Sequence, residues 1–583
     1  MSTTLSPRAR HDPRRDRGAR SWLTPARRFP LVVVLVTVAF VIAGWSRRWT
    51  VDDAFIVFRV VDHVLSGHGP VFNVGERVEA VTSPLWLLVM VSASAVVPLP
   101  IEWLAVSIGL VLAAAGLVFA MAGAHLLSSR DGRLVPAGVL LWLGLPPAWD
   151  FATSGLESGL GIAWLGACCW GLARLARAMP VAGRATTPVG LAVLVGLGPV
   201  IRPDFGIFSV AFVVAVLLCA DLDRWARWRV VVAAVAVPGV MEIGRMGYYA
   251  ALLPNTLLAK EAGLSNWSQG WRYVVDFASP YALVIPVGAL AWLIARMTRG
   301  DRDRGPRVVT LAFVVGGVVY SFAVLRGGGD FMHARLLLPA LFAVLAPVAL
   351  VRVRAAGDLV AVAVLACWAL LSAVALRPAM AVDGPGDGIS DQRSFYVEQA
   401  GDAHPVTLDD FRDYARVTRG AHAARLAAAG QRALIADERI EPLAADAAPA
   451  VVYEAGAVGL ASAAAGEDVY VLDRLGLGDA YTARLRLETR RRPGHDKPLP
   501  MAWVWGRYGV MSAVPPDQAT AARAARTAMA CAPLRELDQA ITQPLTVRRF
   551  VDNLVAAPRL TTLRFPSDPR AAVDALCGAN GRA

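Results

Sequence analysis

Two adjacent carboxylates, Asp52 and Asp53, follow the first apolar run of the sequence and precede an apolar, aromatic stretch at residues 54–61. A carboxylate between two such segments could remove a proton from an acceptor hydroxyl or bind a divalent cation. Neighbouring residues of a helix point about 100° apart, so the two aspartates share one cleft only if the backbone breaks there. The simpler alternative is that both end a membrane helix in water.

Polar side chains in two later loops could bind a sugar phosphate. Tyr249, Asn255 and Lys260 follow one apolar run, where an aromatic ring can stack on a sugar and a lysine can hold a phosphate. The densest group surrounds a Gly-Gly-Gly turn that lets the backbone approach a ligand closely. It consists of Arg326, Asp330, His333 and Arg335. Arginine suits phosphate binding, so we interpret this group as functional.

Five further polar residues complete the candidate set, and each also has a purely structural interpretation. They are His68, Glu79, Glu157, Arg202 and Asp204. A lone loop histidine is more often solvated than a ligand. Glu157 is expected in the first turn of a membrane helix, where the helix dipole favours an acid. Arg202 and Asp204 flank a proline and could simply pair with each other.

Composition identifies the kind of protein that must position these residues. The chain has 583 residues, of which 56% are hydrophobic and 18% charged. Its repeated apolar runs match what a bilayer about 30 Å thick requires. The net charge of +12 does not indicate nucleic-acid binding, because the arginines gather in short loops between apolar runs. That distribution follows the positive-inside rule for membrane proteins.

We therefore predict an α-helical polytopic membrane protein with the N-terminus in the cytoplasm. Placing the arginine-rich loops inside gives about eleven spans. They are 29–47, 101–127, 134–148, 158–175, 187–201, 206–221, 229–247, 279–296, 307–324, 335–351 and 358–376. The apolar run at 84–98 is short, so we interpret it as an interfacial or re-entrant helix. This topology places the candidate site residues on the outer face.

Three parts of the chain follow from this topology. Residues 1–28 form a disordered basic cytoplasmic tail, and residues 29–377 form the transmembrane domain with a large first outer loop at 48–100. Residues 378–583 contain no membrane-length run and are predicted to be an extracytoplasmic α/β or α+β domain. Export of this domain would make a Cys531–Cys577 disulfide plausible.

The order of several motifs resembles a known family. The overall layout is similar to the GT-C glycosyltransferases, which use polyprenyl-phosphate sugars. The local motifs resemble the terminal β-1,2-arabinofuranosyltransferases of actinobacterial cell-wall synthesis, the AftB type. They are DDAFIVFR at 52–59, GHGPVFNVGE at 67–76, TSGLE at 153–157, YYAALLPNTLLAK at 248–260, GGDFMH at 328–333, DQRSFY at 391–396 and DRLGLGD at 473–479.

The resemblance implies a donor, an acceptor and a location. The donor would be decaprenylphosphoryl arabinofuranose, and the acceptor would be the arabinan ends of arabinogalactan or lipoarabinomannan. Transfer would occur at the outer face of the plasma membrane, among membrane lipids. One of Asp52 or Asp53 would be the base or would hold a divalent cation, and the sequence does not decide between them.

Developing charge on the phosphate leaving group needs cationic partners. Lys260, His333 and Arg335 are the first candidates, with Arg326 and Arg202 behind them. Glu157 and Asp204 would orient these cations or the sugar.

Two alternatives remain open at the level of sequence. The first is another GT-C enzyme, for example one that uses polyprenyl-phosphate mannose. The second is a transporter or a non-catalytic membrane scaffold. A transporter requires ionisable residues along the middle of its helices, whereas nearly all acids and histidines of this chain fall at helix ends, with Glu242 as the main exception.

Overall fold

The computed structural model describes residues 25–128, 132–178, 187–261, 263–298, 303–353, 355–378, 388–490 and 494–578. Most of the predicted basic tail lies outside these ranges. Within them, helices dominate, and a small sheet occurs only in the C-terminal region, apart from a two-stranded pairing between β1 (Arg133–Val135) and β2 (Val351–Val353).

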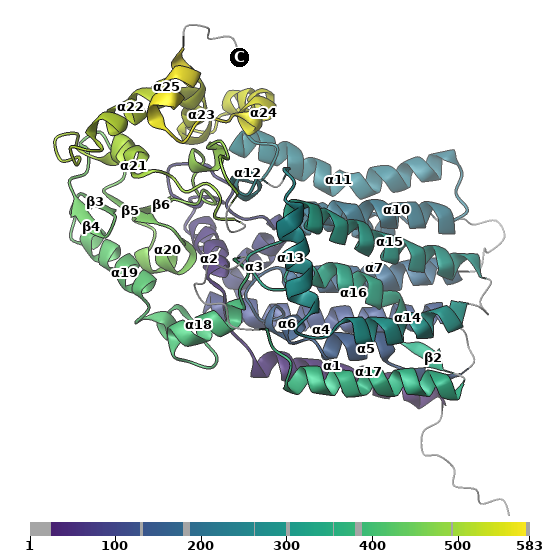
Figure 1. The fold of residues 1–583 in the computed structure, drawn as a ribbon. Coiled ribbons are helices and arrows are strands. Elements are labelled where there is room, and N and C mark those ends of the chain that lie inside the picture. The colour runs from purple at the N-terminus through teal and green to yellow at the C-terminus, as the bar shows by residue number, and fades with distance from the viewer. Residues whose placement is uncertain are drawn as a thin grey trace, which may run out of the picture.

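Six helices of the described chain are long and apolar enough to cross a membrane. They are α1 (Pro25–Ser46), α4 (Ile101–Leu127), α7 (Ser158–Arg177), α11 (Arg224–Tyr249), α15 (Arg304–Gly327) and α17 (Ala356–Val374). Figure 1 shows the long helices side by side in one bundle, with the C-terminal region at one end. Their outward apolar side chains stay exposed, as in Val232, Val235 and Val240 of α11. An apolar surface of this kind indicates a membrane protein.

The remaining helices of this part are shorter. They are α2 (Asp52–Leu65), α3 (Pro84–Val96), α5 (Ala137–Leu143), α6 (Pro146–Asp150), α8 (Val189–Gly196), α9 (Gly198–Ile201), α10 (Gly206–Cys219), α12 (Asn255–Ala259), α13 (Trp267–Ala278), α14 (Val284–Thr298) and α16 (Leu338–Leu345). The chain has no continuous helix over the predicted span 134–148. Pro146 and Pro147 start a separate helix there, because proline cannot continue a helix that needs its backbone N–H.

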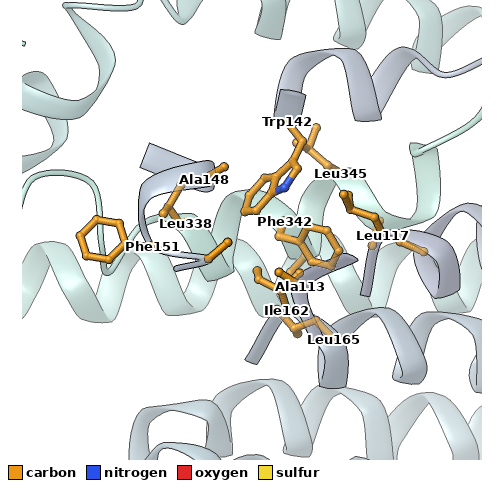
Figure 2. Packing of buried hydrophobic residues seen from close by; sticks show 14 of the residues in the cluster. Ala113, Leu117, Trp142, Ala148, Phe151, Ile162, Leu165, Leu338, Phe342 and Leu345 are labelled. Atoms are coloured by element: carbon orange, nitrogen blue, oxygen red, sulfur yellow. The ribbon is translucent and has the colours of Figure 1, made fainter. Parts of the chain in front are cut away.

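The bundle core depends on close helix contact and on aromatic packing. Where α4 meets α7, a Cβ on Gly159 would lie 2.1 Å from the backbone oxygen of Gly109, so only glycine allows this approach. Small residues at helix contacts are typical of membrane bundles. Figure 2 shows a neighbouring part of the core, where the rings of Trp142 and Phe342 meet edge to face with centroids 4.9 Å apart.

The C-terminal region contains a four-stranded sheet in the order β4-β3-β5-β6. The strands are β3 (Ala433–Ala436), β4 (Arg439–Glu441), β5 (Val451–Ala455) and β6 (Val469–Asp473). β3, β5 and β6 run parallel, and β4 pairs antiparallel with β3. The apolar runs at 451–453 and 469–472 predict two short buried strands from the sequence, and β5 and β6 confirm them.

Helices surround this sheet. They are α18 (Gln392–Ala400), α19 (Ala415–Ala428), α20 (Gly459–Ala465), α21 (Met501–Tyr508), α22 (Ala519–Met529), α23 (Ala532–Thr542), α24 (Val547–Thr562) and α25 (Pro569–Cys577). The structure forms the predicted disulfide, which joins Cys531 at the start of α23 to Cys577 at the end of α25. Sheet and helices together match the predicted α/β or α+β character of this region.

Candidate active site

A cavity of about 470 Å³ lies between the helical bundle and the C-terminal region. Residues from both parts line it. From the first 340 residues they are Val51, Asp52, Asp53, Ile56, Lys260 and Phe331. On the other side the cavity meets the loops after β5 and β6, including Val458 and Asp473. Loops at the carboxyl ends of parallel strands are a recurrent place for ligand binding.

Asp53 is the candidate with the most suitable environment for acid–base chemistry. Its side chain is 22% exposed, and one carboxylate oxygen lies 3.9 Å from Arg335 Nη1. Burial raises the pKa of Asp53 to about 6, although the positive charges of Lys260 and Arg335 oppose the rise. A carboxylate with this pKa is ionised at neutral pH and close enough to it to accept a proton efficiently.

Asp52 has a different role from its neighbour in the structure. Its carboxylate is buried and accepts hydrogen bonds from the backbone N–H groups of Gly459, at 3.1 Å, and Leu460, at 3.0 Å. These are the first residues of α20, where unpaired N–H groups and the helix dipole favour a negative charge. Because successive helical residues diverge, Asp52 binds α20 while Asp53 is left for the cavity.

Arg59, two turns after Asp52 on α2, binds the opposite end of α20. Its guanidinium donates to the backbone oxygens of Ser462, at 2.9 Å, and Gly466, at 2.7 Å. It also donates to the backbone oxygens of Phe72 and Val469. The end carbonyls of a helix attract a cation. The two helices therefore lie side by side, with the carboxylate of Asp52 at the start of α20 and the guanidinium of Arg59 at its end.

A chain of ion pairs leads from Asp53 into the bundle. Arg335 contacts Asp330 at 3.3 Å and Glu157 at 3.7 Å as well as Asp53. Glu157 in turn accepts from Arg202 at 2.7 Å. Burial raises the pKa of Glu157, but Arg202 and Arg335 outweigh it, and the net pKa is lowered. This part of the network holds Arg335 in a fixed position behind Asp53.

The end of this ion-pair network that is farthest from Asp53 lies inside the bundle. Arg202 forms two parallel hydrogen bonds with Asp204, both at 3.0 Å. Asp204 also accepts from the hydroxyl of Tyr320 at 2.7 Å. The predicted Arg202–Asp204 pairing is thus present, and neither residue lines the cavity.

Three candidates lie at the seam between the bundle and the C-terminal region instead of in the cavity. Asn255 donates to the backbone oxygens of Gly476 and Asp479 at 2.8 and 3.1 Å. Tyr249 donates to the backbone oxygen of Pro70 at 2.8 Å. Glu79 pairs with Arg245 at 2.7 Å. Asn255 therefore joins the bundle to the C-terminal region. Tyr249 and Glu79 instead join the first loop of the N-terminal part to α11.

His333 and Arg326 are also outside the cavity. His333 is buried, with Nδ1 2.6 Å from Asp276 and Nε2 3.1 Å from the hydroxyl of Tyr281. Both ring nitrogens are therefore engaged. Arg326, at the end of α15, donates to the backbone oxygen of Gly263. Its part of the helix is exposed.

His68 is on the surface, 3.8 Å from Glu467.

The structure adds cavity residues that are not among the site candidates predicted above. They are Ser390, Gln392, Tyr396, Gln399, Tyr414, Arg416, Asp473 and His495. Three of them fall inside two motifs already noted, at 391–396 and 473–479. Arg416 had no comparable signal, because it lies in an alanine-rich helix with no spacing that marks a site. Its pKa is raised: burial opposes the rise, and the nearby charge of Asp52 favours it.

A divalent cation would have limited protein ligands at this site. No group of three or more His, Cys, Asp or Glu side chains in the described residues is placed to hold a metal ion. Both oxygens of Asp52 accept backbone hydrogen bonds. Asp53 is accordingly the member of the pair that is left to bind either a proton or a cation.

Comparison with known proteins gives results for both parts of the chain. Residues 434–575 match the model of the AftB family C-terminal domain. The chain is 34% identical to the terminal beta-(1->2)-arabinofuranosyltransferase of Mycobacterium tuberculosis, over 93% of this chain and 96% of that protein. It is also 34% identical to the protein of the same name from Corynebacterium glutamicum, over 90% of this chain and 83% of that protein. No solved structure matches it.

Proposed function

This chain belongs to the family of terminal beta-(1->2)-arabinofuranosyltransferases, and we propose that it transfers arabinofuranose from decaprenylphosphoryl arabinofuranose to the ends of cell-wall arabinan. The acceptor is the arabinan of arabinogalactan or of lipoarabinomannan. The enzyme is a glycosyltransferase, and the observation that carries the assignment of its site is the position of Asp53. This carboxylate lines a large cavity together with Lys260, and its pKa is about 6.

The proposed reaction uses few protein groups. Asp53 accepts the proton of an arabinan hydroxyl as that oxygen attacks the anomeric carbon of the donor sugar. The bond from this carbon to the phosphate oxygen breaks, and decaprenyl phosphate leaves with the bonding electrons. Lys260 stabilises the negative charge that develops on the phosphate, because an oriented cation acts strongly in a site shielded from water. Arg335 orients Asp53 from behind.

Asp52 is a positioning residue in this proposal. Its contacts with Gly459 and Leu460 fix the start of α2, and the next residue of that helix is Asp53. The C-terminal region therefore contributes to the active centre in two ways: it lines the cavity, and it holds the helix that carries the base.

We also propose that the cavity opens on the outer face of the plasma membrane. Arg224, Arg227 and Arg229 lie at the start of α11, and the other end of this helix contacts the C-terminal region. Figure 1 also shows β2, with Arg352, at the end of the bundle away from that region. The positive-inside rule puts such basic ends in the cytoplasm. The N-terminus is then cytoplasmic and residues 378–583 extracytoplasmic.

The test is sugar transfer from synthetic decaprenylphosphoryl arabinofuranose to an arabinan oligosaccharide. Asp53→Asn should lower turnover by about 10²- to 10⁴-fold, the usual contribution of a general base. The matched control is Asp62→Asn on the same helix, because Asp62 does not line the cavity. Full turnover by Asp53→Asn would refute the assignment. Loss of turnover in chelator, restored by Mg²⁺ or Mn²⁺, would show that the reaction needs a divalent cation.

A further inference from the structure

The exposed apolar residues of the C-terminal region are concentrated on one helix. In the described part of residues 388–578, the exposed large hydrophobic side chains are Ile440, Leu545, Val547, Val551 and Val555. Three of these five lie on α24, and Leu545 lies two residues before it. Val547 and Val555 are 85% and 78% exposed. Spacings of four place all three valines on one face of the helix.

A polar face lies beside the valine face. Arg548, Asp552 and Arg559 are exposed at positions four and seven residues apart, which also brings them onto one face. The helix therefore presents an apolar stripe and a charged stripe next to each other. This division is typical of helices that lie in the plane of a membrane surface.

A third face of α24 packs on the end of the membrane helix α11. The ring of Phe550 covers Gly247, where an added Cβ would lie 2.2 Å from the ring. Asn553 donates to the backbone oxygen of Gly247 at 3.1 Å. The hydroxyl of Thr561 accepts from the backbone N–H of Leu252 at 2.8 Å. In Figure 1, α24 (yellow) lies beside the end of α11 that faces the C-terminal region.

The surface of α11 next to this contact is also apolar and exposed. Val240 is 72% exposed and Ile243 is 54% exposed, and both lie within two turns of Gly247. On a membrane-spanning helix these side chains face lipid. The valines of α24 are therefore held at the place where a lipid-facing surface ends and the headgroup region begins.

We propose that α24 is an interfacial helix whose Val547, Val551 and Val555 face is inserted into the bilayer around α11. Such faces reach about 5–10 Å into the boundary between headgroups and acyl chains. The three valines thus contact lipid, and not another protein. This inference rests on α11 as a membrane span and is independent of the chemistry assigned to the cavity.

The test measures the depth of α24 in the full-length protein. A spin-labelled noncanonical residue is placed at Val551 or, as the matched control, at the adjacent Asp552 on the polar stripe. Each protein is reconstituted as one chain per lipid nanodisc. The label at 551 should be several-fold less accessible to a water-soluble nickel complex and more accessible to oxygen than the label at 552. Equal accessibility at both positions would overturn the proposal.

Two further measurements keep the result interpretable. Both labelled proteins should retain the unlabelled protein's thermal unfolding temperature, because both positions are exposed and make few internal contacts. A second pair, Val555 against Arg559, should give the same contrast. If protection at 551 occurs only in discs that hold two copies, the face is a contact between chains, and the lipid proposal is wrong.

Discussion

The carboxylate of Asp52 accepts a hydrogen bond of 3.1 Å from the backbone N–H of Gly459, although the two residues are 407 positions apart in the sequence. The approach is so close that a Cβ on Gly459 would lie 1.8 Å from the backbone oxygen of Asp52. The helix that carries Asp53 is thus fitted directly against a helix of the C-terminal region. The geometry of the proposed base depends on this contact.

Gly459→Ala should separate α2 from α20. The added methyl group meets a backbone oxygen, which cannot rotate away as a flexible side chain could. We expect a stability loss of about 1–3 kcal/mol, as for other overpacked sites, and a fall in turnover because Asp53 moves. The measurements are thermal unfolding in detergent and the transfer assay. Gly357→Ala is the matched helical control, because a Cβ there meets nothing within 4 Å. Equal behaviour of the two variants would contradict the prediction.

Asp52→Asn should lower turnover and also change its pH dependence. A misplaced base costs roughly 10²-fold when the shift approaches 1 Å. The charge of Asp52 is one of the causes that raise the pKa of Asp53. Its removal should therefore move the acidic limb of the pH–rate profile to lower pH. An unchanged limb would show that the charge of Asp52 does not act on Asp53, and an unchanged rate would contradict the positioning role.

The parent enzyme should lose activity as the pH falls through about 6, where Asp53 becomes protonated. Folding raises this pKa above the ordinary value of 3.8, so the ionised side chain destabilises the fold above pH 6 and has no such effect below about pH 4. Asp53→Asn should consequently raise the free energy of unfolding at pH 8 by at most about 3 kcal/mol, and with it the unfolding temperature. The gain should vanish near pH 4. Thermal unfolding of both proteins across this range checks the sign.

Lys260→Met should reduce turnover by about 10²-fold, since it removes the cation proposed to stabilise the leaving phosphate. The charge of Lys260 also opposes the rise in the pKa of Asp53. The acidic limb of the residual activity should thus move to higher pH, opposite to the effect of Asp52→Asn. Lys260→Arg keeps the charge and should retain the parent limb. A Lys260→Met enzyme with the parent rate and limb would exclude this residue from the mechanism.

The sequence predicted the membrane character and the strands β5 and β6, and it marked the Asp52–Asp53 pair as the candidate active centre. These depend on local patterns, namely apolar runs, β-branched runs and adjacent charges. It did not separate the roles of the two aspartates, because the partner of Asp52 is a backbone group in α20. A backbone N–H carries no sequence signal.

The same limit explains the other candidates. The sequence predicts His333 and Asn255 as ligand-binding residues because both are polar and fall between apolar runs. Their partners, Asp276 and the backbone at 476–479, become visible only in three dimensions. Helix breaks inside predicted spans such as 134–148 were not foreseen. Hydropathy responds to burial in lipid and in protein alike and does not measure helix continuity.

The docking of α2 on α20 has a consequence for biogenesis. Residues 52 and 53 are made early, whereas Gly459 emerges only after more than four hundred further residues. Until α20 has folded against α2, the cavity lacks one wall and the base lacks its support. We therefore expect a chain that ends before Gly459 to lack transferase activity, because the proposed active centre is completed only late in synthesis.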